Sequence, residues 1–527
     1  MSTHTLRTTA VMVGLIALVL PLAASAQPTV TWNTYLGGSA ADGSATNDKP
    51  QGVLTDRYGR TFVTGGTDAT RFPGSTSQPS VPSGQDAFLT YFNAEGRVAK
   101  TYLFGGASHD VGRRLAFNPS AEDHLYIVGT TASSTIRDGV PVYGSLQGET
   151  DAFLARMDWS GSELSLTWFM YLGGSGKDEG NDVAVYRKDN LLVVYVVGKN
   201  ADEAFVARVD IDSANKQPSL PWGITTFGSP GVIDEAFAVA TAPNNHQVYV
   251  GGVVRGPVSP SNKLPTPLNG FSTGEDGFFA ELNPADGTVK WFEYLGGGSD
   301  DDVRDILHQP TSGAIIIIGN TNSSNFPPKD THSGKGVFLL RVNRDTTQGA
   351  IGGISAQLRI GEGGESMEGH GAVDARDNVY VGGTTTTSRL SHNAFDPGFD
   401  PGTSKSDGFV AMVGFELNGL VWTSYVGGPT DTPEAVMGLS AVPVGQLTFV
   451  GHSTAQKNLL VVDTGDDPSA NGGEDGFVFR VEVDPEAVPR PEAPLGWSCS
   501  SVSSGGPLSL LTLALLALRR ARRRSAR

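Results

Sequence analysis

The side chains of this sequence that could hold a metal ion lie in short acidic loops, each of which follows a pair of glycines. Four aspartates stand four residues beyond the second glycine of such a pair: Asp42, Asp110, Asp178 and Asp301. Carboxylates in glycine-rich loops suit Ca²⁺, which takes about six to eight oxygen ligands. The run Asp300-Asp301-Asp302 is the best candidate for a calcium site. We favour the competing explanation, in which each aspartate caps a tight turn.

Further aspartates and several histidines are the other candidates for chemistry. Five aspartates open expected strands: Asp86, Asp151, Asp276, Asp407 and Asp475. A residue that recurs in every unit belongs to the scaffold, since an active site has to be built only once. His109, His308 and His370 lie near expected inner strands and could face a central channel, although each is more often a structural histidine.

Known catalytic motifs are absent from the sequence. It contains no H-E-x-x-H pair, no G-x-S-x-G elbow, no phosphate-binding P-loop and no pair of zinc-ligating cysteines. We therefore name no catalytic residue and no cofactor other than the possible Ca²⁺. An enzymatic role stays open, and a protein without enzymatic activity is the favoured interpretation.

The glycine pairs belong to a phrase, Tyr-Leu-Gly-Gly in its clearest form, that recurs along most of the chain. Each unit also carries an aromatic-Val-x-Gly phrase, as at 62–65, and an Asp-small-Phe phrase, as at 86–88. A fixed period of this kind indicates a repeat architecture. The recurring phrase begins at intervals of 56 to 69 residues, at Tyr35, Tyr102, Tyr171, Phe227, Tyr294, Ile360 and Tyr425.

The elements that position these residues are expected to be strands. Runs of β-branched residues, as in 191–197, indicate strands, and the first unit predicts four of them, near 50–55, 60–66, 86–92 and 98–105. Four-stranded sheets repeated radially form a β-propeller. We predict an all-β fold, a seven-bladed β-propeller of four-stranded blades over residues 27–484.

The outer strands and the chain ends indicate how this ring is packed and closed. Four tryptophans precede a Tyr by three residues, an odd offset that places the two rings on opposite faces of a strand: Trp32, Trp168, Trp291 and Trp422. The repeat region starts with a Tyr-Leu-Gly-Gly phrase, on an expected outer strand near 30–37, and ends with an Asp-Gly-Phe strand near 476–483. We expect these two segments to pair, so that the N-terminal strand completes the last blade.

The order of these phrases resembles the SBBP (seven-bladed beta-propeller) repeat family of bacterial exported proteins, over about residues 29–485. The resemblance implies a propeller with a surface or secreted location and implies no particular enzyme activity. The third, fourth and fifth units depart from the pattern in places, which affects their loops rather than the ring.

Long linkers between the second and third strands suggest where the protein could bind something. They occupy 66–85, 130–150, 252–275, 320–335, 384–406 and 452–474, whereas the third unit has only 199–202. In a propeller such linkers emerge on one face, which favours binding of a protein or a glycan. Alternatively, the linkers fold over the rim, with pairs such as Phe72-Pro73 and Phe326-Pro327 as small plugs. A polysaccharide hydrolase or lyase at the channel and a structural coat or adhesion element are the other hypotheses.

Both ends of the chain carry targeting signals. Residues 1–26 have a basic start, an apolar stretch and an Ala-Ser-Ala site, which predict a signal peptide cleaved by signal peptidase after Ala26. Residues 485–496 form a Pro-rich linker. Residues 497–527 contain Cys499, the only cysteine, then an apolar run and an Arg cluster. An uncleaved N-terminal anchor and a plain C-terminal membrane anchor are the alternatives.

The C-terminal layout resembles myxobacterial C-terminal sorting signals. That resemblance implies cleavage near Cys499 by a sorting protease, with membrane contact through the C-terminal segment. It also implies display on the cell surface or outer membrane, or secretion after processing. The net charge of −17 argues against nucleic acid as a partner.

Overall fold

The computed structural model contains strands and no helix in the residues it describes. These are 27–40, 42–75, 84–119, 124–136, 139–160, 163–212, 217–229, 232–243, 246–258, 270–272, 274–326, 335–344, 351–361, 366–399, 406–428, 434–453 and 473–485. This part of the chain has no helix with the length and apolar character needed to cross a membrane. The cleavage site at Ala26 and the segment around Cys499 lie outside the described residues.

Five sheets are built from strands that follow one another in the chain. The first two contain additional short strands at their outer side. They are β6 (Asp110–Phe117), β7 (His124–Thr131), β9 (Asp151–Ser160) and β10 (Glu163–Leu172) with β8 (Val142–Tyr143), then β11 (Glu179–Lys188), β12 (Leu191–Asn200) and β13 (Glu203–Asp212) with β14 (Pro218–Ser219) and β15 (Ile224–Phe227).

The other three of these sheets have four strands each, paired antiparallel in chain order. They are β16 (Glu235–Ala242), β17 (Gln247–Val254), β18 (Asp276–Leu282) and β19 (Val289–Leu295), then β20 (Asp301–His308), β21 (Ile315–Thr321), β22 (Gly336–Arg344) and β23 (Ile351–Ile360), and finally β24 (Ser366–Val373), β25 (Val379–Thr385), β26 (Asp407–Val413) and β27 (Leu420–Val426).

A sixth sheet joins the two ends of the described chain. β1 (Thr29–Leu36) pairs antiparallel with β30, from Thr29 opposite Glu482 to Leu36 opposite Gly476. A short parallel pairing of Thr46 and Asn47 with residues of β30 links this group to β2. The strands are β28 (Glu434–Ser440), β29 (Gln446–Ser453) and β30 (Gly473–Glu482), followed by β2 (Thr46–Thr55), β3 (Thr61–Thr67), β4 (Asp86–Phe92) and β5 (Val98–Phe104).

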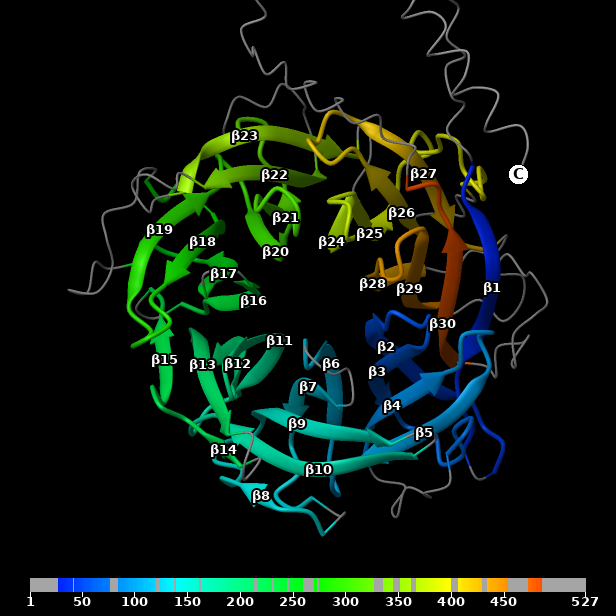
Figure 1. The fold of residues 1–527 in the computed structure, drawn as a ribbon, viewed down its shortest axis with the longest axis vertical. Coiled ribbons are helices and arrows are strands. Elements are labelled where there is room, and N and C mark those ends of the chain that lie inside the picture. The colour runs from blue at the N-terminus through cyan, green and yellow to red at the C-terminus, as the bar shows by residue number, and fades with distance from the viewer. Residues whose placement is uncertain are drawn as a thin grey trace, which may run out of the picture. The chain divides into compact units, whose positions relative to one another are not determined.

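The sheets are arranged radially around a central axis, with the first strand of each group innermost (Figure 1). These inner strands contact one another in the cyclic order β2, β6, β11, β16, β20, β24 and β28, and β28 contacts β2. Twisted antiparallel sheets in this arrangement form a β-propeller. The prediction of an all-β propeller is therefore confirmed.

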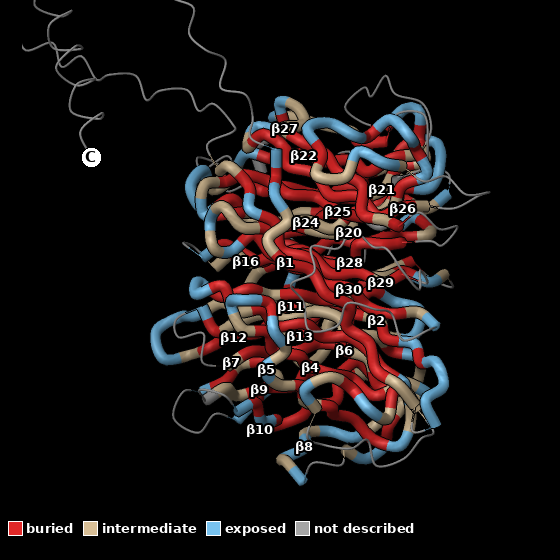
Figure 2. The backbone as a smooth tube through the Cα atoms, turned by 90° about the vertical axis from the view of Figure 1, so that its right-hand side faces the viewer, coloured by how far each residue is buried: buried red, intermediate tan, exposed pale blue. Residues whose placement is uncertain are grey.

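The hydrophobic cores lie between neighbouring sheets, so that most strands are buried on both faces (Figure 2). On β10, Trp168 packs into the core shared with β11 to β13, whereas Tyr171 packs into the core shared with β4. On β27, Trp422 and Tyr425 likewise enter two different cores. The predicted opposite orientation of the paired aromatic residues is confirmed, because an odd offset on a strand reverses the face.

Two of the Phe-Pro pairs in the linkers close the rim. Phe72 is 5% exposed and stacks near Phe88, with the ring centroids 4.9 Å apart. Phe326 is fully buried, with its ring centroid 4.4 Å from that of Phe338. These linkers therefore fold over their sheets at those points, as the alternative interpretation of the loops expected.

Trp32 provides a test of how firmly β1 holds the two ends together. Its ring stacks on Phe92 at 6.0 Å and lies beneath the Arg480 guanidinium. We expect Trp32→Ala to lower the free energy of unfolding by about 3–5 kcal/mol, because it leaves a large cavity between two sheets. Tyr58→Ala, at a ring that is 60% exposed, should cost less than about 1 kcal/mol. Equal denaturant midpoints for the two variants would contradict this packing.

Candidate ligand-binding site in the central channel

The inner strands share an irregularity that shapes the channel. Each contains a break in register next to the axis, at which one strand carries additional residues relative to its partner. Such bulges redirect side chains away from the regular pleat. The phrases of the repeat are similar from sheet to sheet, but the residue directly after the break is not. These residues are Gly52, Arg114, Asp182, Ala238, Asp305, His370 and Gly438.

A cavity of about 170 Å³ lies at this point on the axis. Every inner strand contributes to its wall, and several of the contributing residues come from the bulges. The lining residues are Gln51, Arg113, Arg114, Asn181, Phe237, Arg304, His370 and Met437. The polar residues of a single site are therefore collected from many different repeats, which short linear motifs do not reveal.

Arg114 and His370 form a contact across the channel. The Arg114 Nη2 lies 2.9 Å from His370 Nδ1 and 3.5 Å from Nε2, while its Nη1 donates to the Gln51 carbonyl. A guanidinium can only donate, so the contact favours a neutral imidazole, and both ring nitrogens lie within reach of the same Nη2. Burial, with the nearby charges of Arg114 and Arg304, holds the pKa of His370 well below its usual value.

Two carboxylates lie close to Arg114 and join neighbouring inner strands. Asp182 accepts backbone N–H bonds from Val183 and from Val239 of the next inner strand, both at 2.8 Å. Asp305 accepts in the same way from Ile306 at 2.8 Å and from Gly371 of the next strand at 3.0 Å. Burial and the neighbouring charge of Asp305 raise the pKa of Asp182 to about 7, and burial also raises the pKa of Asp305.

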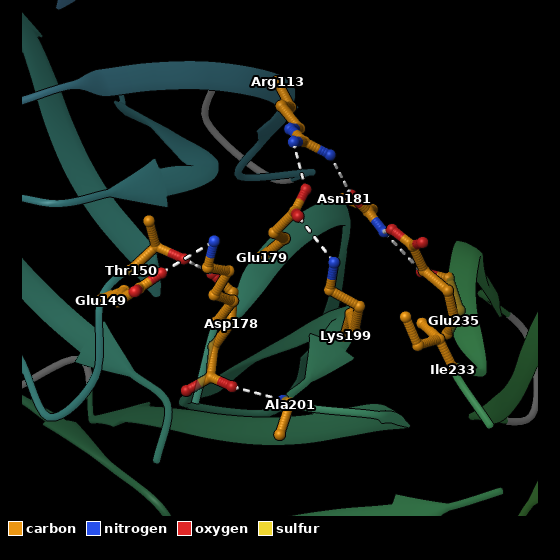
Figure 3. A network of polar contacts seen from close by, with 12 residues as sticks. Arg113, Glu149, Thr150, Asp178, Glu179, Asn181, Lys199, Ala201, Ile233 and Glu235 are labelled. Carbon is orange, nitrogen blue, oxygen red and sulfur yellow. Dashed lines mark hydrogen bonds and ion pairs between the residues drawn. The ribbon is translucent and has the colours of Figure 1, made fainter. Parts of the chain in front are cut away.

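A chain of polar contacts extends from the channel mouth over three adjacent sheets (Figure 3). Arg113 of β6 pairs with Glu179 of β11 at 2.5 Å, and Lys199 pairs with the same carboxylate at 2.7 Å. Asn181 accepts from Arg113 and donates to Glu235 of β16 at 2.8 Å. Burial opposes ionisation of Glu179, but Arg113 and Lys199 outweigh it and keep the pKa of this carboxyl below its usual value.

A groove of about 520 Å³ adjoins the channel cavity and shares Gln51 and Arg113 with it. The cavity and this groove therefore lie side by side, and we refer to the two together as the cleft. The remaining groove residues are Lys49, Gln85, His109, Val111, Thr130, Glu149, Thr150, Lys177 and Glu179.

The three histidines expected near inner strands have different environments. His370 faces the channel cavity, and His109 lines the groove, where its Nδ1 accepts the Gln85 backbone N–H at 3.3 Å. His308 ends β20, and burial lowers its pKa. It lines neither the cavity nor the groove. Arg114, Asp182 and Asp305 were not predicted from the sequence as site residues. The signal that could have found them is that other inner strands have Gly or Ala at the equivalent positions, as at Gly52 and Ala238.

The acidic run expected to bind calcium is engaged with the protein itself. Asp301 is buried and accepts the Gly297 N–H and the Ser323 hydroxyl, both at 2.7 Å. Asp302 pairs with Arg304 at 2.8 Å, and Asp300 is exposed. The described residues contain no group of three or more His, Cys, Asp or Glu that could hold a metal ion. The structure therefore does not bring Asp300, Asp301 and Asp302 together as a metal site.

The same turn-capping arrangement recurs at other glycine pairs. Asp110 accepts the Gly106 N–H at 2.8 Å, and Asp178 accepts that of Gly174. In the first repeat the aligned Asp42 is wrong for this role, since it is exposed and bonds only to Ser44. Asp48 replaces it and accepts the Gly38 N–H at 2.8 Å, because β2 begins later than the spacing suggests.

No protein-family model and no curated protein match the sequence. Among solved structures, the chain is similar to the polysaccharide lyase Uly1, at 10% identity and a TM-score of 0.41 over 86% of this chain and 100% of that chain. It is also similar to the WD40 domain of SCAP from fission yeast, at 7% identity and a TM-score of 0.35 over 89% and 98% of the two chains. The Bombyx mori GH32 beta-fructofuranosidase BmSUC1 is similar at 10% identity and a TM-score of 0.27, over 88% and 94%.

The Asp301 turn can be tested by two neighbouring substitutions. We expect Asp301→Ala to reduce the free energy of unfolding by about 1–3 kcal/mol, because buried donors lose their acceptor. Asp300→Ala, at an exposed side chain, should change it by less than about 0.5 kcal/mol. Thermal unfolding with added Ca²⁺ and with chelator measures the calcium hypothesis directly. A rise in Tm with Ca²⁺ that Asp301→Ala abolishes would restore the metal interpretation.

The raised pKa of Asp182 predicts a pH-dependent stability. Because its folded pKa of about 7 exceeds the unfolded value near 4, protonation stabilises the fold fully below about pH 4, and this stabilisation is lost as the pH rises through 7. We expect a loss on the order of 2 kcal/mol between pH 5 and pH 8. The Tm of the unmodified chain should therefore fall over this range, and Asp182→Asn should flatten the slope. Parallel profiles for the two proteins would refute the assignment.

Proposed function

We propose that this chain is an exported seven-bladed β-propeller that binds a glycan in the cleft running from the channel across one face. In the proposed count, β28, β29, β30 and β1 make one blade, and β2 to β5 make the next. The cyclic contacts of the inner strands and the pairing of β1 with β30 support this count. The N-terminal strand then completes the last blade, and the ring has no free sheet edge at the chain ends.

The observation that carries the binding proposal is a cavity and an adjoining groove whose lining residues are not the residues repeated in each unit. The two meet at Gln51 and Arg113. Amide and guanidinium side chains from different sheets converge there, and Phe237 provides an aromatic ring beneath the Arg304 guanidinium at 4.2 Å. Planar groups with several donors and acceptors are suited to a ligand that carries many hydroxyl groups.

A glycan fits this cleft better than a protein partner does. Protein interfaces centre on apolar and aromatic side chains surrounded by a polar rim. The residues that line the cleft are instead mostly polar or charged. The large exposed hydrophobic residues of the described chain all lie outside it: Tyr58, Val142, Ile233, Ile354, Val442 and Val444.

The proposed location follows from the chain ends and from the resemblance to SBBP repeats. A signal peptide through Ala26 would direct export, and processing near Cys499 would place the propeller on the cell surface. Intact-mass analysis of the membrane fraction tests this part. A protein that retains residues 500–527 would rule out the processing.

A polysaccharide hydrolase or lyase is the second candidate, favoured by one observation. Asp182, with its pKa near 7, has the protonation behaviour that suits a general acid or base at neutral pH. Its two oxygens accept backbone N–H bonds, which supports a structural role, so binding without turnover is our primary proposal. Release of reducing ends from a bound polysaccharide, lost in Asp182→Asn, would establish the enzymatic alternative.

Arg113 provides the test of glycan binding. We expect Arg113→Ala to weaken glycan binding about tenfold, the effect of losing one charge-assisted hydrogen bond. Lys199 remains to pair with Glu179 in this variant. Arg187→Ala is the matched control, because Arg187 is an exposed arginine of β11, in the neighbouring sheet, and it donates to the Asp189 carbonyl of its own turn. Calorimetric titration with dextran and with polygalacturonate measures both, and failure of the unmodified chain to bind either polymer, or equal affinities for the two variants, counts against the proposal.

A further inference from the structure

The charged side chains that line the channel cavity are positive, whereas the net charge of the whole chain is negative. The sequence carries a net charge of −17, yet the described lining of the cavity contains Arg113, Arg114, Arg304 and His370 and no carboxylate. Concentrating cationic side chains in a narrow, poorly solvated space is costly unless an anion or buried counter-charges balance them.

The two carboxylates near Arg114, those of Asp182 and Asp305, bond to the protein backbone and do not line the cavity. Each of their four oxygens accepts a backbone N–H bond. They therefore support Arg114 from the side of the strands. Arg113 and Arg304 have carboxylate partners of their own, Glu179 and Asp302, so it is Arg114 that favours an anion, because its carboxylate neighbours do not line the cavity.

His370 adds a further donor to those of Arg114. Its ring lines the cavity in the neutral form, which carries one N–H donor. Guanidinium groups and N–H donors match the planar or tetrahedral oxygens of a carboxylate or a sulfate. The arrangement fits an oxyanion better than a sugar hydroxyl, which has to donate as well as accept.

The volume of the cavity restricts what can enter. About 170 Å³ accommodates one charged substituent or a single sugar residue, and the adjoining groove of about 520 Å³ takes a longer segment. Because Gln51 and Arg113 belong to both, a glycan lying in the groove can place one residue at the axis.

We propose that the channel cavity binds the oxyanion, carboxylate or sulfate, of an acidic glycan whose neighbouring residues lie in the groove, and so selects acidic over neutral glycans. This inference rests on the proposed glycan-binding function and adds the ligand class. Arg114 and His370 contact the oxyanion, and Arg304 closes the mouth over Phe237.

The experiment compares polymers that differ only in charge. Calorimetric titration of the full chain uses polygalacturonate, its fully methyl-esterified form, dextran sulfate and dextran, together with sodium acetate and sodium sulfate as free anions. We expect each acidic polymer to bind at least about tenfold more tightly than its neutral counterpart, and the ratio to fall as salt is added. The free anions should bind far more weakly, because the groove contacts are missing.

Variants of the cavity locate the selectivity. Arg114→Gln and His370→Gln should bring the acidic-to-neutral ratio close to one while the neutral polymer still binds through the groove. Should Arg114→Gln fail to fold, Arg304→Gln at the half-buried mouth tests the same charge effect. Arg187→Gln, at the exposed end of β11, is the control and should leave the ratio unchanged.

The outcomes separate the two proposals. Equal binding of the charged and uncharged polymers leaves the glycan function standing and overturns the selection of an oxyanion. Binding of no polymer overturns both. A ratio that persists in Arg114→Gln, His370→Gln and Arg304→Gln also overturns the inference, because the charge preference would then arise elsewhere.

Discussion

The whole structure depends on burying both faces of every sheet between two neighbouring sheets. Among the described residues, the hydrophobic clusters draw their members from neighbouring sheets. The outer strands show how this is achieved, since Trp168 and Tyr171 of β10 enter different cores. Each sheet then needs a partner on both sides, which only a ring of sheets provides without disulfide bonds or large apolar faces in water.

The ring in turn dictates where chemistry can arise. Residues that recur in several units, such as Asp110, Asp178 and Asp301, accept the backbone N–H of a glycine pair and connect one sheet to the next. The bulges of the inner strands lie where all units meet. There Arg114, Asp182, Asp305 and His370 replace the Gly or Ala of other units, so that a repeated scaffold carries one unrepeated site.

The electrostatics of this site follow from its crowding. Arg114 stabilises the charge of both Asp182 and Asp305, but burial raises the pKa of both carboxyls, and Asp305 adds to the effect on Asp182. Burial, together with the charges of Arg114 and Arg304, lowers the pKa of His370 and keeps its ring neutral, and Arg114 contacts that ring. The raised pKa of Asp182, about 7, and the neutral imidazole reduce the compensation of the positive charge of Arg114. The proposed preference of the channel cavity for acceptor groups rests on this reduced compensation.

The sequence by itself determined the strands, their period and the two-sided aromatic packing, because these depend on local spacing and on the alternation of side chains along a strand. It also indicated that Phe72 and Phe326 could be plugs, and that aspartates would cap turns. Local spacing failed at Asp42, since a shift in the start of β2 gives the role to Asp48. The site was decided only by the tertiary structure. Arg114 and His370 are 256 residues apart, and no pattern in the chain relates them. They meet because the closed ring brings every inner strand to one axis.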